Sequence, residues 1–132
     1  MKIKLILTFV FLINQLVFSQ KQNKVQEDSI YHTSDLDVKP EYPGGLNEFY
    51  KFINQKYKVP KVKGLRGKIF VAFVVEKNGS LARIQIIRDF GYGTGKEAYR
   101  VLKLSPRWKP GKLNKQIVRS LFWMPITVEY KQ

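Results

Sequence analysis

Residues 68–88 read Lys-Ile-Phe-Val-Ala-Phe-Val-Val-Glu-Lys-Asn-Gly-Ser-Leu-Ala-Arg-Ile-Gln-Ile-Ile-Arg, and this stretch decides the fold. Its first nine residues are rich in β-branched and aromatic side chains, which favours a strand buried on at least one face. An Asn-Gly pair at 78–79 follows and is a strong signal for a hairpin turn. Ile84 and Ile86 then alternate with polar neighbours, so a return strand over 81–88 should keep them on the core face. The stretch therefore predicts two antiparallel strands.

A helix is predicted on each side of this hairpin. Ahead of it, apolar side chains recur at positions 46, 49, 50, 53 and 57, which form one face of an amphipathic helix. Turn residues at 40–45 precede this helix, and Pro60 follows it. Behind the hairpin, Thr94 and Glu97 have the spacing of a capping box, which predicts a helix over 96–104.

The last regular segment is a long apolar strand, predicted over 117–130. Pro125 lies inside it, and a proline cannot donate to a β-ladder, so we expect this strand at an edge of the sheet. The order of helix, hairpin, helix and edge strand is that of an α+β domain. We expect a small antiparallel β-sheet packed against two helices.

The N-terminal region is typical of an export signal followed by a linker. Residues 1–4 are basic and residues 5–13 are uncharged and almost entirely apolar, which predicts a signal peptide over 1–19, cleaved between Ser19 and Gln20. The alternative is an uncleaved membrane anchor, but the apolar run ends at residue 18, and a spanning helix needs roughly 20 apolar residues. Residues 20–39 are polar and aperiodic, so we expect a linker there and a folded domain over 40–132.

Length and composition exclude several classes of protein. A chain of 132 residues holds one domain with attachments, which excludes a two-domain enzyme, a (β/α)₈ barrel and a protein kinase. Cysteine is absent, which excludes disulfides, thiolate zinc sites and a cysteine nucleophile. The one histidine, His32, lies in the expected linker, so we expect neither a histidine metal site nor a Ser-His-Asp triad. The sequence thus predicts no catalytic residues, no metal and no cofactor.

The chain is strongly basic. Lysine and arginine number 24 against 10 acidic residues, which gives a formal net charge of +14. Of these, 19 basic and 6 acidic side chains fall within residues 40–132, so the charge belongs to the predicted domain. A charge of this size favours an acidic partner, such as nucleic acid, phospholipid headgroups, cell-envelope polymer or an acidic protein surface.

Two motifs for phosphate or nucleic acid are matched only in part. Residues 91–96 resemble a glycine-rich phosphate loop, but Lys96 stands where a dinucleotide site needs glycine, and Glu97 where a Walker motif needs Ser or Thr. Residues 66–73 resemble an RNA-recognition strand, but the expected companion strand upstream is replaced by linker, and the export signal separates the chain from RNA. We therefore expect no nucleic-acid partner.

Several stretches taken together resemble the C-terminal domain of TonB, in the form common in Bacteroidetes-type bacteria. They follow one another in the family's order, and the resemblance spans about residues 40–130. The stretches are Pro40-Glu41-Tyr42-Pro43-Gly44-Gly45, Val75-Glu76-Lys77-Asn78-Gly79-Ser80, Glu97-Ala98-Tyr99-Arg100-Val101-Leu102-Lys103, Ser105-Pro106-Arg107-Trp108-Lys109-Pro110-Gly111 and Met124-Pro125-Ile126.

The resemblance implies a periplasmic, non-enzymatic binding domain in TonB-dependent transmembrane transport. In that family the last strand lies at a sheet edge and accepts a receptor peptide, the TonB box, as an added strand. By resemblance, Arg119 would either steer an acidic part of the peptide or be a solvated strand arginine, and Trp108 would pack so as to lock the crossover before the last strand. Trp123 would anchor the peptide or pack in the core or an interface. The partner-binding edge expected here consists of Ile117, Val118, Arg119, Ser120, Leu121, Phe122 and Trp123.

Further expectations about partners follow from the N-terminus and the charge. With only residues 20–39 as a spacer, we expect a free or briefly tethered domain. If residues 1–19 stay as an anchor, inner-membrane motor proteins become possible partners. An exposed edge could also pair with a second copy and form a homodimer. The alternative function is that of a basic envelope domain that binds an anionic polymer such as peptidoglycan or lipopolysaccharide.

Overall fold

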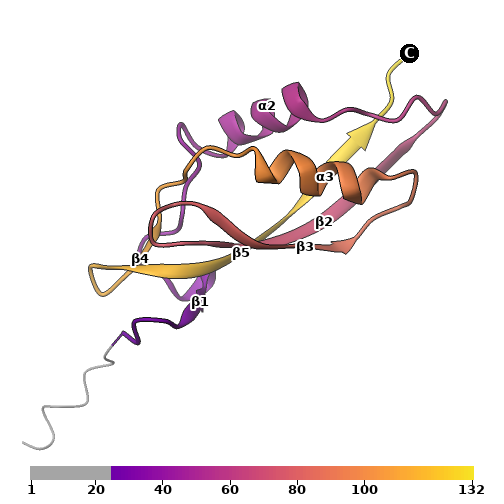
Figure 1. The fold of residues 1–132 in the computed structure, drawn as a ribbon. Helices are drawn as coiled ribbons and strands as arrows, with labels where there is room; N and C mark the ends of the chain where they lie inside the picture. Colours follow the sequence, from indigo (N-terminus) through magenta and orange to yellow (C-terminus); the bar gives the residue numbers. More distant parts are fainter. Residues whose placement is uncertain (1–24) are drawn as a thin grey trace, which may run out of the picture.

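The computed structural model describes residues 25–132 (Figure 1). The predicted signal peptide over 1–19 and its cleavage site between Ser19 and Gln20 lie outside these residues. In chain order the elements are β1 (Ile30–His32), the 3₁₀ turn η1 (Thr33–Asp35), α2 (Leu46–Lys56), β2 (Arg66–Val75), β3 (Leu81–Arg88), α3 (Thr94–Lys103), β4 (Gly111–Leu113) and β5 (Gln116–Glu129).

Two layers make up the molecule, with α2 and α3 on one face of a five-stranded sheet (Figure 1). The strand order is β1-β5-β2-β3, and β4 pairs with the start of β5. The longest ladder is antiparallel and joins β2 to β5, from Arg66 opposite Glu129 to Val75 opposite Ser120. The predicted α+β fold is confirmed. The sheet itself is mixed, because β1 runs parallel to β5.

The predicted hairpin over 68–88 is confirmed as β2 and β3. The Asn78 side-chain oxygen accepts hydrogen bonds from the amide and the hydroxyl of Ser80, at 2.9 and 2.7 Å, and so fixes the turn. Gly79 has a φ of +84°, and a side chain at this position would collide with the backbone of Trp108. The Gly79 carbonyl accepts a hydrogen bond from the Trp108 amide at 2.8 Å. The hairpin turn therefore also positions the segment that leads to β4.

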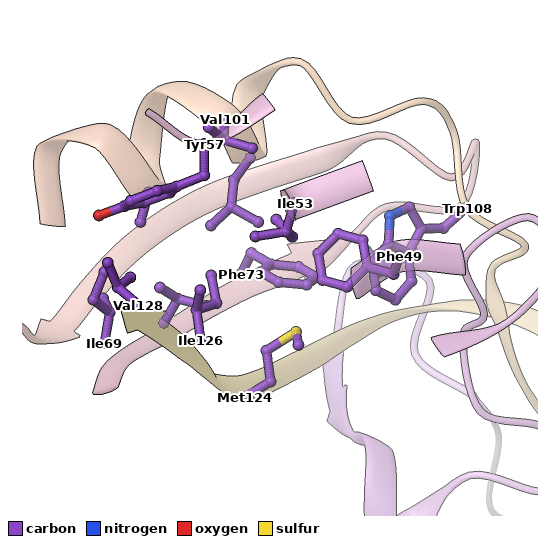
Figure 2. Close-up of a cluster of buried hydrophobic side chains, with 14 residues drawn as sticks. Phe49, Ile53, Tyr57, Ile69, Phe73, Val101, Trp108, Met124, Ile126 and Val128 are labelled. Atoms are coloured by element: carbon purple, nitrogen blue, oxygen red, sulfur yellow. The ribbon is translucent and has the colours of Figure 1, made fainter. Parts of the chain in front are cut away.

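The core lies between the helices and the sheet. Alternate residues of β2 and β5 point toward the helices, and Ile69, Phe73 and Ile126 among them are at most 2% exposed. Figure 2 shows Phe73 lying between α2, through Phe49, and the side chains of β5. The buried cluster consists of Phe49, Ile53, Tyr57, Ile69, Val71, Phe73, Val75, Ala98, Val101, Leu102, Trp108, Met124, Ile126 and Val128.

The prediction of a linker over 20–39 is wrong for residues 30–39. Residues 30–32 form β1, and the Val38 backbone pairs with Lys112 through two hydrogen bonds of 2.9 and 3.1 Å. A strand of three residues is too short to leave an alternating pattern in the sequence, which is why composition alone suggested a linker. The folded part of the chain therefore begins ahead of residue 40.

The predicted capping box at the start of α3 is also wrong. The N-cap is Gly93, in the left-handed region with a φ of 73°, and Thr94 is the first helical residue. The Thr94 hydroxyl donates to the Gly91 carbonyl at 2.6 Å, back into the preceding turn. Glu97 accepts a hydrogen bond from the Lys58 amide at 2.9 Å instead of reaching back to the cap. Its carboxylate therefore ties the end of α2 to α3, and the helix starts two residues earlier than predicted.

Candidate functional site

The candidate site is the edge of β5 that faces away from β2. At Arg119, Ser120 and Leu121 this edge is occupied by β1. Over 122–129 the only strand that pairs with β5 within the described part of the chain is β2. The outward backbone groups of 122–129 are therefore open to an additional strand.

The structure moves this open edge toward the C-terminus relative to the sequence prediction. Of the predicted edge residues, Ile117 and Val118 pair with β4, and the next three lie beside β1. Phe122 and Trp123 are the two that fall on the open part. The sequence predicted a binding edge on this strand because Pro125 indicated an edge, and the unpaired stretch over 122–129 lies on the same strand. The prediction placed the edge too early because β1 was not recognised.

Pro125 shows which backbone groups point outward. The ladder between β2 and β5 runs without a register shift from 120 to 129, across Pro125 opposite Phe70. A proline can hold such a position only where its nitrogen points away from the partner strand. Because successive residues point their amides to alternate sides, those of Trp123, Thr127 and Glu129 also face outward. The open edge thus offers three N–H donors, with a gap at Pro125.

The side chain of Arg119 is held by hydrogen bonds within the domain. Its guanidinium donates two hydrogen bonds to the Glu76 carboxylate, at 2.8 and 2.9 Å, and a third to the Asp28 carbonyl at 3.1 Å. The side chains of Arg119 and Glu76 are only 20% and 24% exposed. These bonds lower the pKa of Glu76 below its ordinary value. Arg119 therefore ties the segment before β1 to the end of β2, rather than standing free to steer a peptide.

Two hollows lie between α2 and β5. The first, about 180 Å³, is bordered by Leu46 of α2, Phe122 of β5, and the side chains of Tyr42 and Trp108. The second, about 190 Å³, is bordered by residues of α2 and its C-terminal extension, and by the second half of β5. Its lining consists of Ile53, Asn54, Tyr57, Val59, Ile126, Thr127, Val128, Glu129 and Lys131.

Tyr57 is one of the residues that line the second hollow. Its hydroxyl donates to the Thr94 carbonyl at 2.8 Å, which links the end of α2 to the start of α3. Burial, with the nearby carboxylates of Glu97 and Asp89, raises the pKa of Tyr57 to about 12. The hydroxyl therefore stays protonated at neutral pH, and the second hollow keeps a neutral wall on this side.

The two tryptophans have different places. Trp108 is 4% exposed and its ring centroid lies 5.0 Å from that of Phe49 and 5.2 Å from that of Phe122. The predicted packing role of Trp108 is confirmed. Trp123 is 63% exposed, so the prediction that it packs in the core is wrong. Trp123 lies on the open edge, so its role as a peptide anchor or an interface residue remains a prediction.

Residues 25–132 show neither a metal-ligand cluster nor a membrane-spanning helix. No three His, Cys, Asp or Glu side chains come together there as metal ligands do. In the same residues, no helix combines the length and the apolar character of a membrane span.

Comparison with known proteins gave one family. Residues 59–131 match the family described as the Gram-negative bacterial TonB protein C-terminal. The match covers β2, β3, α3, β4 and β5, and it begins after α2. No curated protein and no solved structure matches the chain.

Proposed function

Since the chain belongs to the TonB C-terminal family, a family of cell-envelope transport domains, we propose that it binds TonB-dependent outer-membrane receptors in the periplasm. The partner would be the TonB box of a receptor, which would add as a strand to the open edge of β5 over 122–129. The proposed role is binding and not catalysis.

The observation that carries this proposal is an unpaired strand edge beside two hollows. An added peptide would exchange backbone hydrogen bonds with Trp123, Thr127 and Glu129, each contributing about 0.5–1.5 kcal/mol net. Side chains on the helix-facing side of the peptide would enter the hollows next to Phe122 and Ile126. Backbone pairing gives affinity that depends little on sequence, and the hollows add selectivity.

The proposal is tested by titrating the ¹⁵N-labelled protein with a synthetic TonB-box peptide from a receptor of the same cell. The expected result is a saturable set of amide shifts within residues 122–129. Thr127→Pro removes one outward donor and should weaken binding at least about tenfold, because it also places a ring in the path of the peptide. Thr127→Ala, the matched control, should bind as the unchanged protein does.

Two results would count against strand addition on this edge. One is a peptide that shifts no amide in 122–129 of the unchanged protein, a measurement that does not depend on the stability of any variant. The other is a Thr127→Pro protein that keeps its spectrum and binds with unchanged affinity.

A second candidate function is the binding of an anionic envelope polymer. The observation that favours it is charge: 19 basic side chains stand against 6 acidic ones in residues 40–132. Ion pairs in the described part of the chain involve Lys51, Arg100 and Arg119, so most of the other cations remain available for long-range attraction. Binding of peptidoglycan fragments or lipopolysaccharide that falls steeply with added salt, without peptide selectivity, would support this function over the first.

A further inference from the structure

We propose that the two hollows between α2 and β5 select an extended receptor peptide with two bulky apolar side chains four residues apart. The inference rests on the proposed function, because it names the partner of the same edge. It goes beyond that function in giving the peptide a spacing and an apolar chemistry.

The spacing follows from the register of the edge. On β5, Phe122 lines the first hollow and Ile126 lines the second, and both point to the helix side. In a strand paired with β5, residues with side chains on that same side recur every second position. The residues opposite Phe122 and Ile126 are therefore four apart, about 13 Å along the strand. This spacing holds whichever way the peptide runs.

The lining of the first hollow is largely apolar and favours an apolar side chain of the peptide. Leu46 is 50% exposed although it lies in the first turn of α2, facing Phe122 across the hollow. Trp108 and Tyr42 complete its wall. A leucine, isoleucine or phenylalanine side chain placed here would cover the exposed half of Leu46, and burial of apolar area stabilises the complex.

The side chains that line the two hollows carry no net formal charge, because Lys131 stands against Glu129 at the second hollow and Lys39 against Glu41 at the first. The apolar contacts and their spacing, rather than charge, therefore select the peptide.

The helix wall of the two hollows lies outside the part of the chain that matches the family. The match starts at residue 59, whereas Leu46, Ile53, Asn54 and Tyr57 precede it. The sheet edge, Val59 and Trp108 belong to the matched region. The family match therefore bears on the edge, whereas the depth of the hollows rests on the placement of α2 in this structure.

The test compares two fluorescein-labelled peptides of identical composition by fluorescence anisotropy with the purified protein. In acetyl-Ser-Glu-Leu-Thr-Val-Thr-Leu-Thr-Ser-amide the leucines are four apart and share a face. In acetyl-Ser-Glu-Leu-Thr-Val-Leu-Thr-Thr-Ser-amide they are three apart and face opposite sides. We expect the first peptide to bind at least about tenfold more tightly, because an apolar pocket discriminates by about that factor per lost side-chain contact.

Two variants of the protein test whether the first hollow causes the preference for the four-residue spacing. Leu46→Ala should weaken the first peptide by about fivefold, since it removes half-exposed apolar surface from the first hollow. Leu104→Ala is the matched control, because Leu104 is 52% exposed and follows α3, away from the two hollows.

The outcomes separate the inference from the proposed function. If a receptor TonB-box peptide shifts amides in 122–129 while the two leucine isomers bind equally, the inference is overturned and the proposed function stands. If neither the receptor peptide nor either isomer binds, both are overturned. A preference for the four-residue spacing that is lost in Leu46→Ala and kept in Leu104→Ala supports the inference.

Discussion

Trp108 and Trp123 have very different surroundings because they lie at different places in the fold. Trp108 sits against the Gly79 turn, and its indole nitrogen donates to the Ser105 hydroxyl at 3.0 Å. Its ring meets those of Phe49, Phe73 and Phe122 edge to face, a geometry that adds to the effect of burial. Trp123, one position from Phe122, points to the other side of the sheet and into solvent.

Replacing each tryptophan by alanine should therefore have very different effects on stability. Trp108→Ala removes the centre of the aromatic cluster and should lower the free energy of unfolding by about 3–5 kcal/mol. Trp123→Ala, the control, should change it by no more than about 0.5 kcal/mol. Urea unfolding followed by far-UV circular dichroism measures both. Equal losses would mean that the aromatic cluster is not the centre of the core.

The Glu76–Arg119 pair makes stability depend on pH. Because the folded state lowers the pKa of Glu76, its contribution is complete above the ordinary value near 4.5 and is lost as the pH falls through the lower folded value. Glu76→Gln should therefore be less stable than the unchanged protein at pH 7, and the two should converge as the pH falls below about 4.

Thermal unfolding between pH 3 and pH 7 measures this convergence. Glu48→Gln serves as the control, because the Glu48–Lys51 pair is solvent-exposed and contributes little. A stability difference between Glu76→Gln and the unchanged protein that stays constant over this range would contradict the assignment.

At the scale of elements, the sequence predicted the helices and strands that have a regular spacing of apolar residues. It missed the short strands, which have no such spacing. Both helices, the β2–β3 hairpin and β5 follow from apolar spacing and turn residues, and each is present within a few residues of its predicted bounds. β1 and β4 have three residues each, so their pairing depends on tertiary contacts that no local pattern records. The position of the open edge was missed for the same reason. The two hollows depend on how α2 lies over β5, and the sequence gives no signal for that.

The turn between β4 and β5 contains a residue that does not suit its backbone. Asn114 and Lys115 both have positive φ, 49° and 64°, as a two-residue hairpin loop requires. Asparagine tolerates this conformation, whereas lysine is strained in it. Lys115→Gly should therefore raise the free energy of unfolding by about 0.5–1 kcal/mol.

Lys112→Gly is the matched control, since Lys112 is an exposed lysine inside β4 without positive φ. It should lower the free energy of unfolding by about 0.5–1 kcal/mol, because glycine weakens a strand. Chemical denaturation measures the free energy of unfolding of both variants. A loss of stability in Lys115→Gly would show that the lysine side chain makes a compensating contact.

At the scale of the whole molecule, the helices protect one face of the sheet, while the edge of β5 over 122–129 pairs with no second strand within residues 25–132. Figure 1 shows β1 and the C-terminus at opposite ends of the sheet, with the open part of β5 running between them. The same backbone groups that would receive a receptor peptide could pair with a second copy of the chain. Whether the protein is monomeric thus depends on how well this edge pairs with itself.

Pro125 should limit such self-pairing. Pro125→Ala restores an outward N–H in the middle of the edge, and it should increase self-association, measured as a concentration-dependent shift in sedimentation velocity. Thr127→Ala, which leaves the number of outward donors unchanged, should sediment as the unchanged protein does. A Pro125→Ala protein that remains monomeric at all concentrations would show that the edge is protected by something other than the missing donor.

The same proline has a consequence for the chain before it folds. Residues 120–128 carry no charge and are rich in β-branched and aromatic side chains, the composition of segments that form amyloid-like fibres. Proline is excluded from the stacked ladders of such fibres, since every residue in them must pair with the chains above and below. Pro125 divides this stretch into two shorter pieces. Pro125 should therefore lower the tendency of the unfolded chain to form fibres through this stretch.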